Sequence, residues 1–207
     1  MRLTMIGTGY VGLVSGTCFS EFGHDVCCVD IDPERIETLK AGRIPIFEPG
    51  LDDLVRRNVE AGRLTFTQDI AEGVAGADAV FIAVGTPSRR GDGHADLSYV
   101  YEAARQIASV VTGPTVIVNK STVPVGTARA VRKIVAEAGA AHPIEIASNP
   151  EFLREGSAIN DFMRPDRVVI GAENDQAKDV LRRLYRPLYL IETPILFTGL
   201  ETAELIK

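Results

Sequence analysis

Short apolar runs recur along this chain, and residues with helical spacing separate each run from the next. The strand-like runs lie at 3–6, 25–29, 64–67, 79–84, 115–119, 144–148, 167–171 and 194–199. The helical patterns lie near 10–23, 33–41, 49–61, 97–112, 126–139 and 174–187. Strands that alternate with helices form a parallel sheet, because each crossover lays a helix against the sheet. We therefore predict an α/β fold, a doubly wound and mostly parallel sheet with helices on both faces.

The composition argues against two classes of partner. Apolar residues make up 45% of the 207 positions, but no apolar run approaches the roughly 18 residues that a membrane span needs. The net charge of −6 and the isoelectric point near 5.2 are unsuited to an extended nucleic-acid surface. Met1 leads into "RLTMI" without the pattern of a signal peptide. We expect a cytoplasmic protein that binds neither nucleic acid nor membrane.

The cysteines and histidines indicate neither a disulfide nor a metal site. Cys27 and Cys28 are adjacent in a strand-like run, so their side chains should point to opposite faces, and we expect no bond between them. With Cys18 they are expected to be buried, reduced thiols, which suits a reducing compartment. The three histidines share no motif with one another or with a cysteine pair. We predict no metal site.

The segment "IGTGYVG" has the spacing of a phosphate-binding loop. It places Gly7, Gly9 and Gly12 in the pattern G-x-G-x-x-G, after a strand and at the start of a helix. Such glycines permit a tight turn, close approach of a pyrophosphate, and close packing of helix on strand. Asp30 ends the second strand, where an acidic residue meets the ribose diol. The pattern predicts a Rossmann-type dinucleotide site, and the carboxylate favours NAD over NADP because it would repel a 2′-phosphate.

Neighbouring residues leave alternatives open at this end of the chain. Asp30 could instead cap the helix that begins "DPERI", although Asp32 is the better cap because Pro33 then takes the first helical position. Arg35 could stack on adenine or meet a phosphate. The Gly-rich loop at 88–98, which includes Arg90, is predicted to be a mobile lid beside the cofactor.

Three further motifs each follow a strand: "AVGTP" (83–87), "KSTVPVGT" (120–127) and "NPEFLREG" (149–156). In open α/β sheets ligands bind beyond the carboxyl ends of the strands, so these loops should converge on one crevice. Together with "GTGYVG" and "EPGL" (48–51), they resemble the UDP-glucose 6-dehydrogenase family of nucleotide-sugar dehydrogenases over the whole chain. The resemblance implies that NAD takes two hydrides as UDP-glucose becomes UDP-glucuronate. It also implies that a cysteine holds the aldehyde as a thiohemiacetal, which becomes a thioester and is hydrolysed.

The resemblance also assigns residues to the site, position by position. The residues implied to contact NAD are Gly7, Thr8, Gly9, Tyr10, Val11, Gly12, Asp30, Arg35, Val84, Gly85, Thr86, Pro87, Ser88, Ser121, Thr122, Val123 and Glu155. Those implied to line the sugar side are Glu151, Phe152, Leu153 and Lys207. Catalytic roles fall to three of these residues. Thr122 would hold a water or the substrate hydroxyl, Glu151 would take or relay a proton, and Lys207 would stabilise a developing oxyanion.

Each of these assignments has a structural alternative. Thr122 could be a satisfied hydroxyl at a strand end, and Glu151 could be a first-turn glutamate of a helix that follows Pro150. The pair at 154–155 could form a solvated face, and Lys207 could be an ordinary surface lysine.

The last ten residues, "TGLETAELIK", predict the start of a helix, with Thr198 and Glu201 forming a capping box. The resemblance divides the chain into an NAD-binding Rossmann-type domain at 1–198 and the start of the central connecting helix at 199–207. In the family the rest of that helix, which mediates homodimer contacts, the nucleophilic cysteine and a UDP-binding domain lie further along. We therefore expect this chain alone to be inactive.

Two other functions stay open on the sequence. One is a dehydrogenase of another nucleotide sugar, GDP-mannose or a UDP-N-acetylhexosamine. The other is an NAD-binding module that performs no chemistry.

Overall fold

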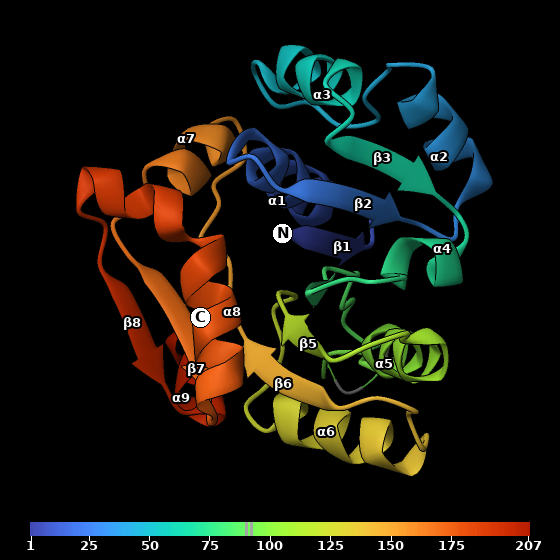
Figure 1. The fold of residues 1–207 in the computed structure, drawn as a ribbon, viewed down its shortest axis with the longest axis vertical. Coiled ribbons are helices and arrows are strands. Elements are labelled where there is room, and N and C mark those ends of the chain that lie inside the picture. The colour runs from blue at the N-terminus through green and yellow to red at the C-terminus, as the bar shows by residue number, and fades with distance from the viewer. Residues whose placement is uncertain (90, 92) are drawn as a thin grey trace.

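The protein folds around one mixed sheet in a computed structural model that describes residues 1–89, 91 and 93–207. Within these residues the sheet has eight strands in the order β3-β2-β1-β4-β5-β6-β7-β8. The strands are β1 (Arg2–Ile6), β2 (Asp25–Val29), β3 (Leu64–Thr67), β4 (Ala79–Ile82), β5 (Thr115–Asn119), β6 (Ile144–Ser148), β7 (Val168–Ala172) and β8 (Ile195–Thr198). Each predicted strand is present, and the N-terminus lies near the middle because β1 is a central strand (Figure 1).

Neighbouring strands run parallel except for β6 and β7, which are antiparallel. The predicted α/β class and mostly parallel sheet are confirmed. Because β7 and β8 run opposite to the other strands, the carboxyl ends of β1, β2, β4, β5 and β6 share one edge of the sheet. The candidate site lies at that edge.

Helices cover both faces of the sheet. The elements are α1 (Tyr10–Glu21), α2 (Pro33–Lys40), α3 (Leu51–Glu60), α4 (Ile70–Val74), α5 (Ser98–Val110), α6 (Thr127–Glu137), α7 (Ala158–Met163), α8 (Asp175–Leu184), the 3₁₀ turn η1 (Arg186–Ile191) and α9 (Leu200–Ile206). The core on one face joins α1, α2, α3, α7 and α8, and the core on the other joins α4, α5, α6 and α9. None of the helices among the described residues is long and apolar enough to cross a membrane.

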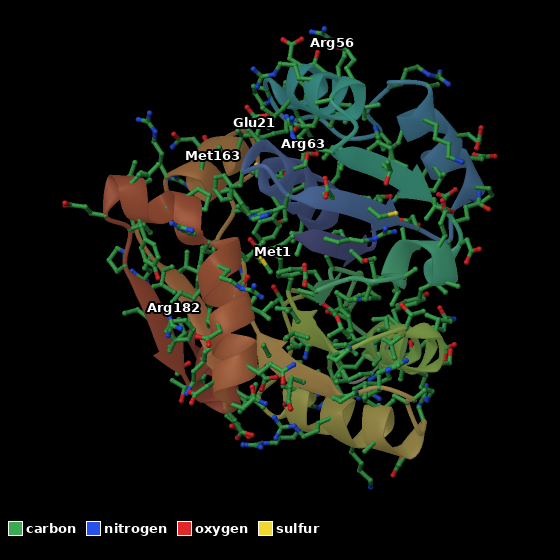
Figure 2. All side chains as sticks on the ribbon, viewed as in Figure 1. Met1, Glu21, Arg56, Arg63, Met163 and Arg182 are labelled. Carbon is green, nitrogen blue, oxygen red and sulfur yellow. The ribbon has the colours of Figure 1, made fainter. Side chains whose placement is uncertain are left out.

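Alternation along the strands divides the buried side chains between these two cores. Cys28 packs against α1 in the first core, and Cys27 packs against α4 in the second. The prediction that the adjacent cysteines face opposite ways is therefore confirmed. Figure 2 shows side chains from the helices and the strands lying in the space between these elements.

The helix-start predictions have mixed outcomes. Asp32 caps α2, because its carboxylate accepts hydrogen bonds from the backbone N–H groups of Glu34 and Arg35. The predicted capping box at Thr198 is wrong. Thr198 pairs with Gly171 as the last residue of β8, and the N-cap of α9 is Gly199, which offers no side chain. Pairing in the sheet takes precedence over the local capping preference.

The short helix α9 is held by tertiary contacts. Leu200 and Ala203 are fully buried. The Glu204 carboxylate accepts hydrogen bonds from the N–H groups of Gly126 (2.6 Å) and Ala128 (2.7 Å) at the start of α6. Burial raises the pKa of Glu204. Because α9 has only seven residues, this docking rather than helix propensity keeps it folded.

At the opposite end of the sheet a polar cluster joins α1 to α3. Buried Asn58 of α3 donates a hydrogen bond to Glu21 of α1 (2.7 Å) and accepts one from Arg63 (2.8 Å). Glu21 and Arg63 lie close together in Figure 2. These bonds fix the C-terminal end of α1, and the glycine loop leads into its N-terminal end.

Candidate functional site

The strand order reverses between β1 and β4, which is where ligands bind in folds of this type. The loops after the strands meet at this edge. Ser121 donates through its N–H to the carbonyl oxygen of Ile82 (3.0 Å) and through its hydroxyl to that of Val84 (2.7 Å). The Thr86 hydroxyl donates to the carbonyl oxygen of Thr122 (2.9 Å). The predicted convergence of the loops after β4 and β5 is confirmed.

The three glycines of the first loop have different geometries. Gly7 has φ +98°, and a Cβ there would lie 2.6 Å from the carbonyl oxygen of Ala83. A Cβ on Gly12 would lie 1.9 Å from the carbonyl oxygen of Gly7. A Cβ on Gly9 would meet nothing within 4 Å. Two glycines therefore allow the backbone to pack closely, and the third leaves open space in front of the N-terminus of α1.

Asp30 is held firmly at the end of β2. One carboxylate oxygen accepts hydrogen bonds from both the N–H and the hydroxyl of Thr8, each 2.7 Å long. The other oxygen accepts the N–H of Asp32 (3.1 Å). The Arg35 guanidinium lies 3.6 Å from the Asp30 carboxylate. Thr8 is fully buried, so its side chain acts on the site through Asp30.

A pocket of about 900 Å³ opens between these elements. The predicted cofactor residues that line it are Gly7, Gly9, Asp30, Arg35, Val84, Gly85, Thr86 and Pro87. Ile31, 83% exposed at the wall, offers an apolar surface beside Asp30. The volume, the open space at Gly9 and the carboxylate match the needs of a dinucleotide: a base, a pyrophosphate and a ribose diol. The residues present fit NAD.

The other predicted cofactor residues do not line this pocket. They are Thr8, Tyr10, Val11, Gly12, Ser88, Ser121, Thr122, Val123 and Glu155. Gly12 packs beneath Gly7, and Val11 packs against the first core. Ser121 and Val123 line a small neighbouring cavity together with Lys207. Several pocket residues, including Tyr99 and Gln106 of α5, carry no motif that would have identified them from sequence.

Part of the predicted lid forms a small bridged turn. Ser88 pairs with Ala95, and the N–H of Arg89 donates to the carbonyl oxygen of His94 (2.7 Å). Arg90 lies outside the described residues. Movement of this loop stays a prediction.

A second pocket, of about 450 Å³, lies beside the loop after β6. Glu151, Phe152 and Leu153 line it, as the resemblance implies for the sugar side. The Lys207 ammonium forms an ion pair with the Glu151 carboxylate at 2.9 Å and lies 5.5 Å from the centre of the Phe152 ring. Two residues 56 positions apart in sequence, each implied to be catalytic, are thus in direct contact.

The alternatives for this loop can now be judged. No helix follows Pro150, since residues 151–154 are irregular and α7 begins at Ala158, so Glu151 is not a first-turn glutamate. Its carboxylate instead accepts the N–H of Leu153 (2.6 Å). Arg154 forms a two-point ion pair with Asp161, whereas Glu155 is exposed on a turn. Thr122 is exposed at the site edge, where its carbonyl accepts from Thr86.

Glu48 is a structural residue of the site to which we assigned no role from sequence. Its buried carboxylate accepts hydrogen bonds from the Tyr10 hydroxyl and from the N–H of Gly156 (2.8 Å). Burial by itself would raise the pKa of Glu48, but these bonds and those from Ile159 and Ala158 outweigh it, and the pKa is lowered. Tyr10 therefore faces Glu48 and the 150s loop rather than the large pocket. Its hydroxyl has a pKa raised to about 12, mainly by burial.

Lys120 also escaped sequence reasoning, although it begins the "KSTVPVGT" motif. Lys120 is only 3% exposed, and its ammonium donates a hydrogen bond to the Oδ1 of Asn149 (3.2 Å). The sequence did offer one signal, a lysine directly after a strongly apolar strand. A residue at that position is buried at the end of the strand.

The three cysteines are buried and unbonded, as predicted. Burial raises the pKa of Cys18 to about 12 and also raises the pKa values of Cys27 and Cys28. None of the three lines either pocket described above.

Comparisons with known proteins find relatives over the whole chain. The NAD-binding domain of the UDP-glucose/GDP-mannose dehydrogenase family matches residues 1–189. A UDP-glucose 6-dehydrogenase of Rhizobium meliloti is 62% identical, and the alignment covers 100% of this chain and 48% of that relative.

Two solved structures share the fold. The UDP-glucose dehydrogenase of Pyrobaculum islandicum is 44% identical with a TM-score of 0.93, covering 99% of this chain and 47% of that one. The GDP-mannose dehydrogenase of Pseudomonas aeruginosa is 36% identical with a TM-score of 0.94, covering 100% of this chain and 48% of that one. The chain thus spans about half the length of these relatives.

Proposed function

The chain belongs to the UDP-glucose/GDP-mannose dehydrogenase family, whose NAD-binding domain it contains, and from this premise we propose that it is the NAD-binding part of a UDP-glucose 6-dehydrogenase. The observation that carries the proposal is the arrangement at one edge of the sheet. The dinucleotide pocket, with Gly9 and Asp30, and Glu151 of the Glu151–Lys207 ion pair belong to loops beyond the carboxyl ends of parallel strands, and hydrogen bonds join the loops after β4 and β5 that lie between them in the strand order. Identity of 62% to a UDP-glucose 6-dehydrogenase favours UDP-glucose among nucleotide sugars.

The residues of the chain divide the work of binding between them. The backbone at Gly9 and the N-terminus of α1 receive the pyrophosphate, because the helix end presents unpaired N–H groups and positive potential. Asp30 accepts hydrogen bonds from the ribose hydroxyls, and Thr8 keeps it oriented. When bound, NAD supplies the hydride acceptor.

The second pocket would orient the sugar. Glu151 takes or relays the proton of the primary alcohol, and Lys207 stabilises negative charge on the same oxygen. Their ion pair keeps both groups at one place before substrate arrives. Thr122, on the exposed loop after β5, can hold a water or the hydroxyl.

Three finer assignments complete the proposal. The chain divides into the NAD-binding domain at 1–198 and the start of a connecting helix at 199–207. The whole enzyme acts as a homodimer. It works in the cytoplasm, since three free cysteines suit a reducing compartment.

The test is to express the uninterrupted reading frame that contains this chain and to offer NAD with UDP-glucose, GDP-mannose and UDP-N-acetylmannosamine separately. We expect two NADH for each UDP-glucuronate formed, and little turnover of the other two sugars. Preferred oxidation of GDP-mannose or of the acetylated sugar would replace the substrate assignment. NAD binding without turnover of any of them would favour a binding module.

A further inference from the structure

Lys120 is a buried cation at the junction of the two site loops. It directly follows β5 and directly precedes Ser121 and Thr122. Its ammonium donates hydrogen bonds to the backbone oxygen (3.5 Å) and the side-chain oxygen (3.2 Å) of Asn149, which directly follows β6. Lys120 thus connects the ends of two neighbouring strands.

Asn149 also forms hydrogen bonds with three other residues. Its side-chain N–H group donates to the carbonyl oxygen of Val169 in β7 (2.9 Å), and its Oδ1 accepts the Tyr185 hydroxyl (2.5 Å). The backbone N–H of Asn149 donates to Asn119 of β5 (2.9 Å). Only one proline separates Asn149 from Glu151, so the placement of Asn149 determines where the Glu151 carboxylate can lie.

The charge of Lys120 is costly to bury. The aromatic rings of Phe81 and Phe162 lie 6.0 and 5.7 Å from its nitrogen and offer some compensation as cation–π partners. The pKa of Lys120 is nevertheless lowered to about 8, chiefly by burial. A methionine of similar length would fill this space without that cost, so the charge calls for a functional explanation.

We propose that Lys120 is a positioning residue: its ammonium joins the ends of β5 and β6 through Asn149 and so holds Glu151 in its ion pair with Lys207. We call the hydrogen bonds from the Lys120 ammonium to Asn149 the clamp. Deprotonation of Lys120 weakens the clamp, because hydrogen bonds from a charged donor are about twice as strong as neutral ones. The clamp is a property of this chain, and its consequence for catalysis rests on the proposed function.

The groups that face Lys120 come from several elements. Glu151, in the loop after β6, favours the charged form, and Lys207 of α9 disfavours it. Cys18 of α1 also faces Lys120, and burial raises the pKa of its thiol to about 12, so it stays neutral where Lys120 titrates. The Tyr185 hydroxyl reaches Lys120 only through Asn149, and burial raises its pKa. At neutral pH, Lys120 is mostly protonated and the clamp is closed.

The test uses the 207-residue chain labelled with ¹³C at the lysine ε-carbons. The chain has five lysines, so each signal can be assigned by substitution: Lys40, Lys120, Lys133, Lys178 and Lys207. We expect Lys120 to titrate near pH 8. The Lys207 signal and the Leu153 amide, which donates to Glu151, should shift with the same midpoint.

The variant Lys120→Met should abolish the pH-dependent shift near pH 8 in both reporter signals, those of Lys207 and of the Leu153 amide. The matched control is Lys133→Met, since Lys133 is exposed on α6 and should leave both signals unchanged. Thermal unfolding checks that Lys120→Met folds, and we expect it to be at least as stable as the wild type at pH 7. A step at Lys207 with an unmoved Leu153 amide would be a through-space charge effect and would overturn the clamp. If neither signal shifted as Lys120 titrates, the clamp would also be overturned.

Kinetics in the whole enzyme give a second readout. Lys120→Met should lower kcat about tenfold to a hundredfold, the range expected for a displaced catalytic group, and leave KM for NAD nearly unchanged. Equal kcat in the variant and the wild type would show that the clamp does not position the catalytic pair. Absence of UDP-glucose oxidation by the wild type would refute the proposed function alone, because the spectroscopic test does not depend on activity.

Discussion

We predict that the choice between NAD and NADP depends on Asp30. Its carboxylate is fixed by Thr8 before the cofactor arrives, so little ordering is required on binding. The variant Asp30→Asn should weaken NAD binding by about 1–3 kcal/mol, as expected for a lost charged hydrogen bond, and narrow the preference over NADP. Calorimetric titration with both cofactors measures this. The control is Glu37→Gln, because Glu37 is an exposed carboxylate on α2. Equal affinity of the wild type for both cofactors would remove Asp30 from this role.

Gly9 and Gly12 should respond differently to the same substitution. Gly12→Ala places a Cβ 1.9 Å from the Gly7 carbonyl oxygen, so we expect a loss of stability of about 3 kcal/mol or more. Gly9 has φ −66° and open space in front of it, so Gly9→Ala should fold normally. It should instead lose NAD affinity, because the added methyl group lies where the pyrophosphate approaches. Thermal unfolding and calorimetry separate the two effects. A stable Gly12→Ala, or a Gly9→Ala that binds NAD normally, would contradict this reading.

At the scale of elements, Glu48 joins α1 to the start of α7. The variant Glu48→Gln should cost about 1–3 kcal/mol of stability at pH 7, because buried N–H donors lose a charged acceptor. The pKa of Glu48 is lowered in the folded state, so its contribution is present above the unfolded value of about 4.3 and is lost as the pH falls through the folded value. Urea unfolding at pH 7 and at pH 3 measures both limits. Glu37→Gln is again the control. If the difference in unfolding free energy between the wild type and Glu48→Gln were the same at pH 3 as at pH 7, the predicted pH dependence would be wrong.

For the whole molecule, we predict that the 207-residue chain binds NAD but produces no NADH from UDP-glucose. The resemblance implies that a cysteine captures the aldehyde, and an accessible thiolate is required for that step. Cys18, Cys27 and Cys28 are all buried, and their pKa values are raised by burial. A thiol reagent should therefore react with the native chain only slowly and with the unfolded chain at once. Steady NADH formation by the chain alone would mean that the chemistry needs no exposed thiol.

Much of the dinucleotide site could be predicted from sequence. The three glycines, the strand that precedes them and Asp30 all lie between residues 2 and 30, and their roles follow from turn geometry and strand period. The buried, unpaired cysteines were also predictable, because neighbouring strand residues face opposite ways. The short elements α4, α7 and η1 escaped prediction, since five or six residues carry too little periodicity.

The amino-acid sequence by itself determined the features that depend on neighbouring residues: the eight strands, the glycine loop and the cap at Asp32. Only the tertiary structure decided which distant residues meet. It paired Glu151 with Lys207, placed Lys120 against Asn149, and used Thr198 in the sheet instead of in a cap. The physical reason is that local preferences are worth about 1 kcal/mol each, whereas burying a charge or satisfying a sheet bond depends on partners that only the fold brings within reach.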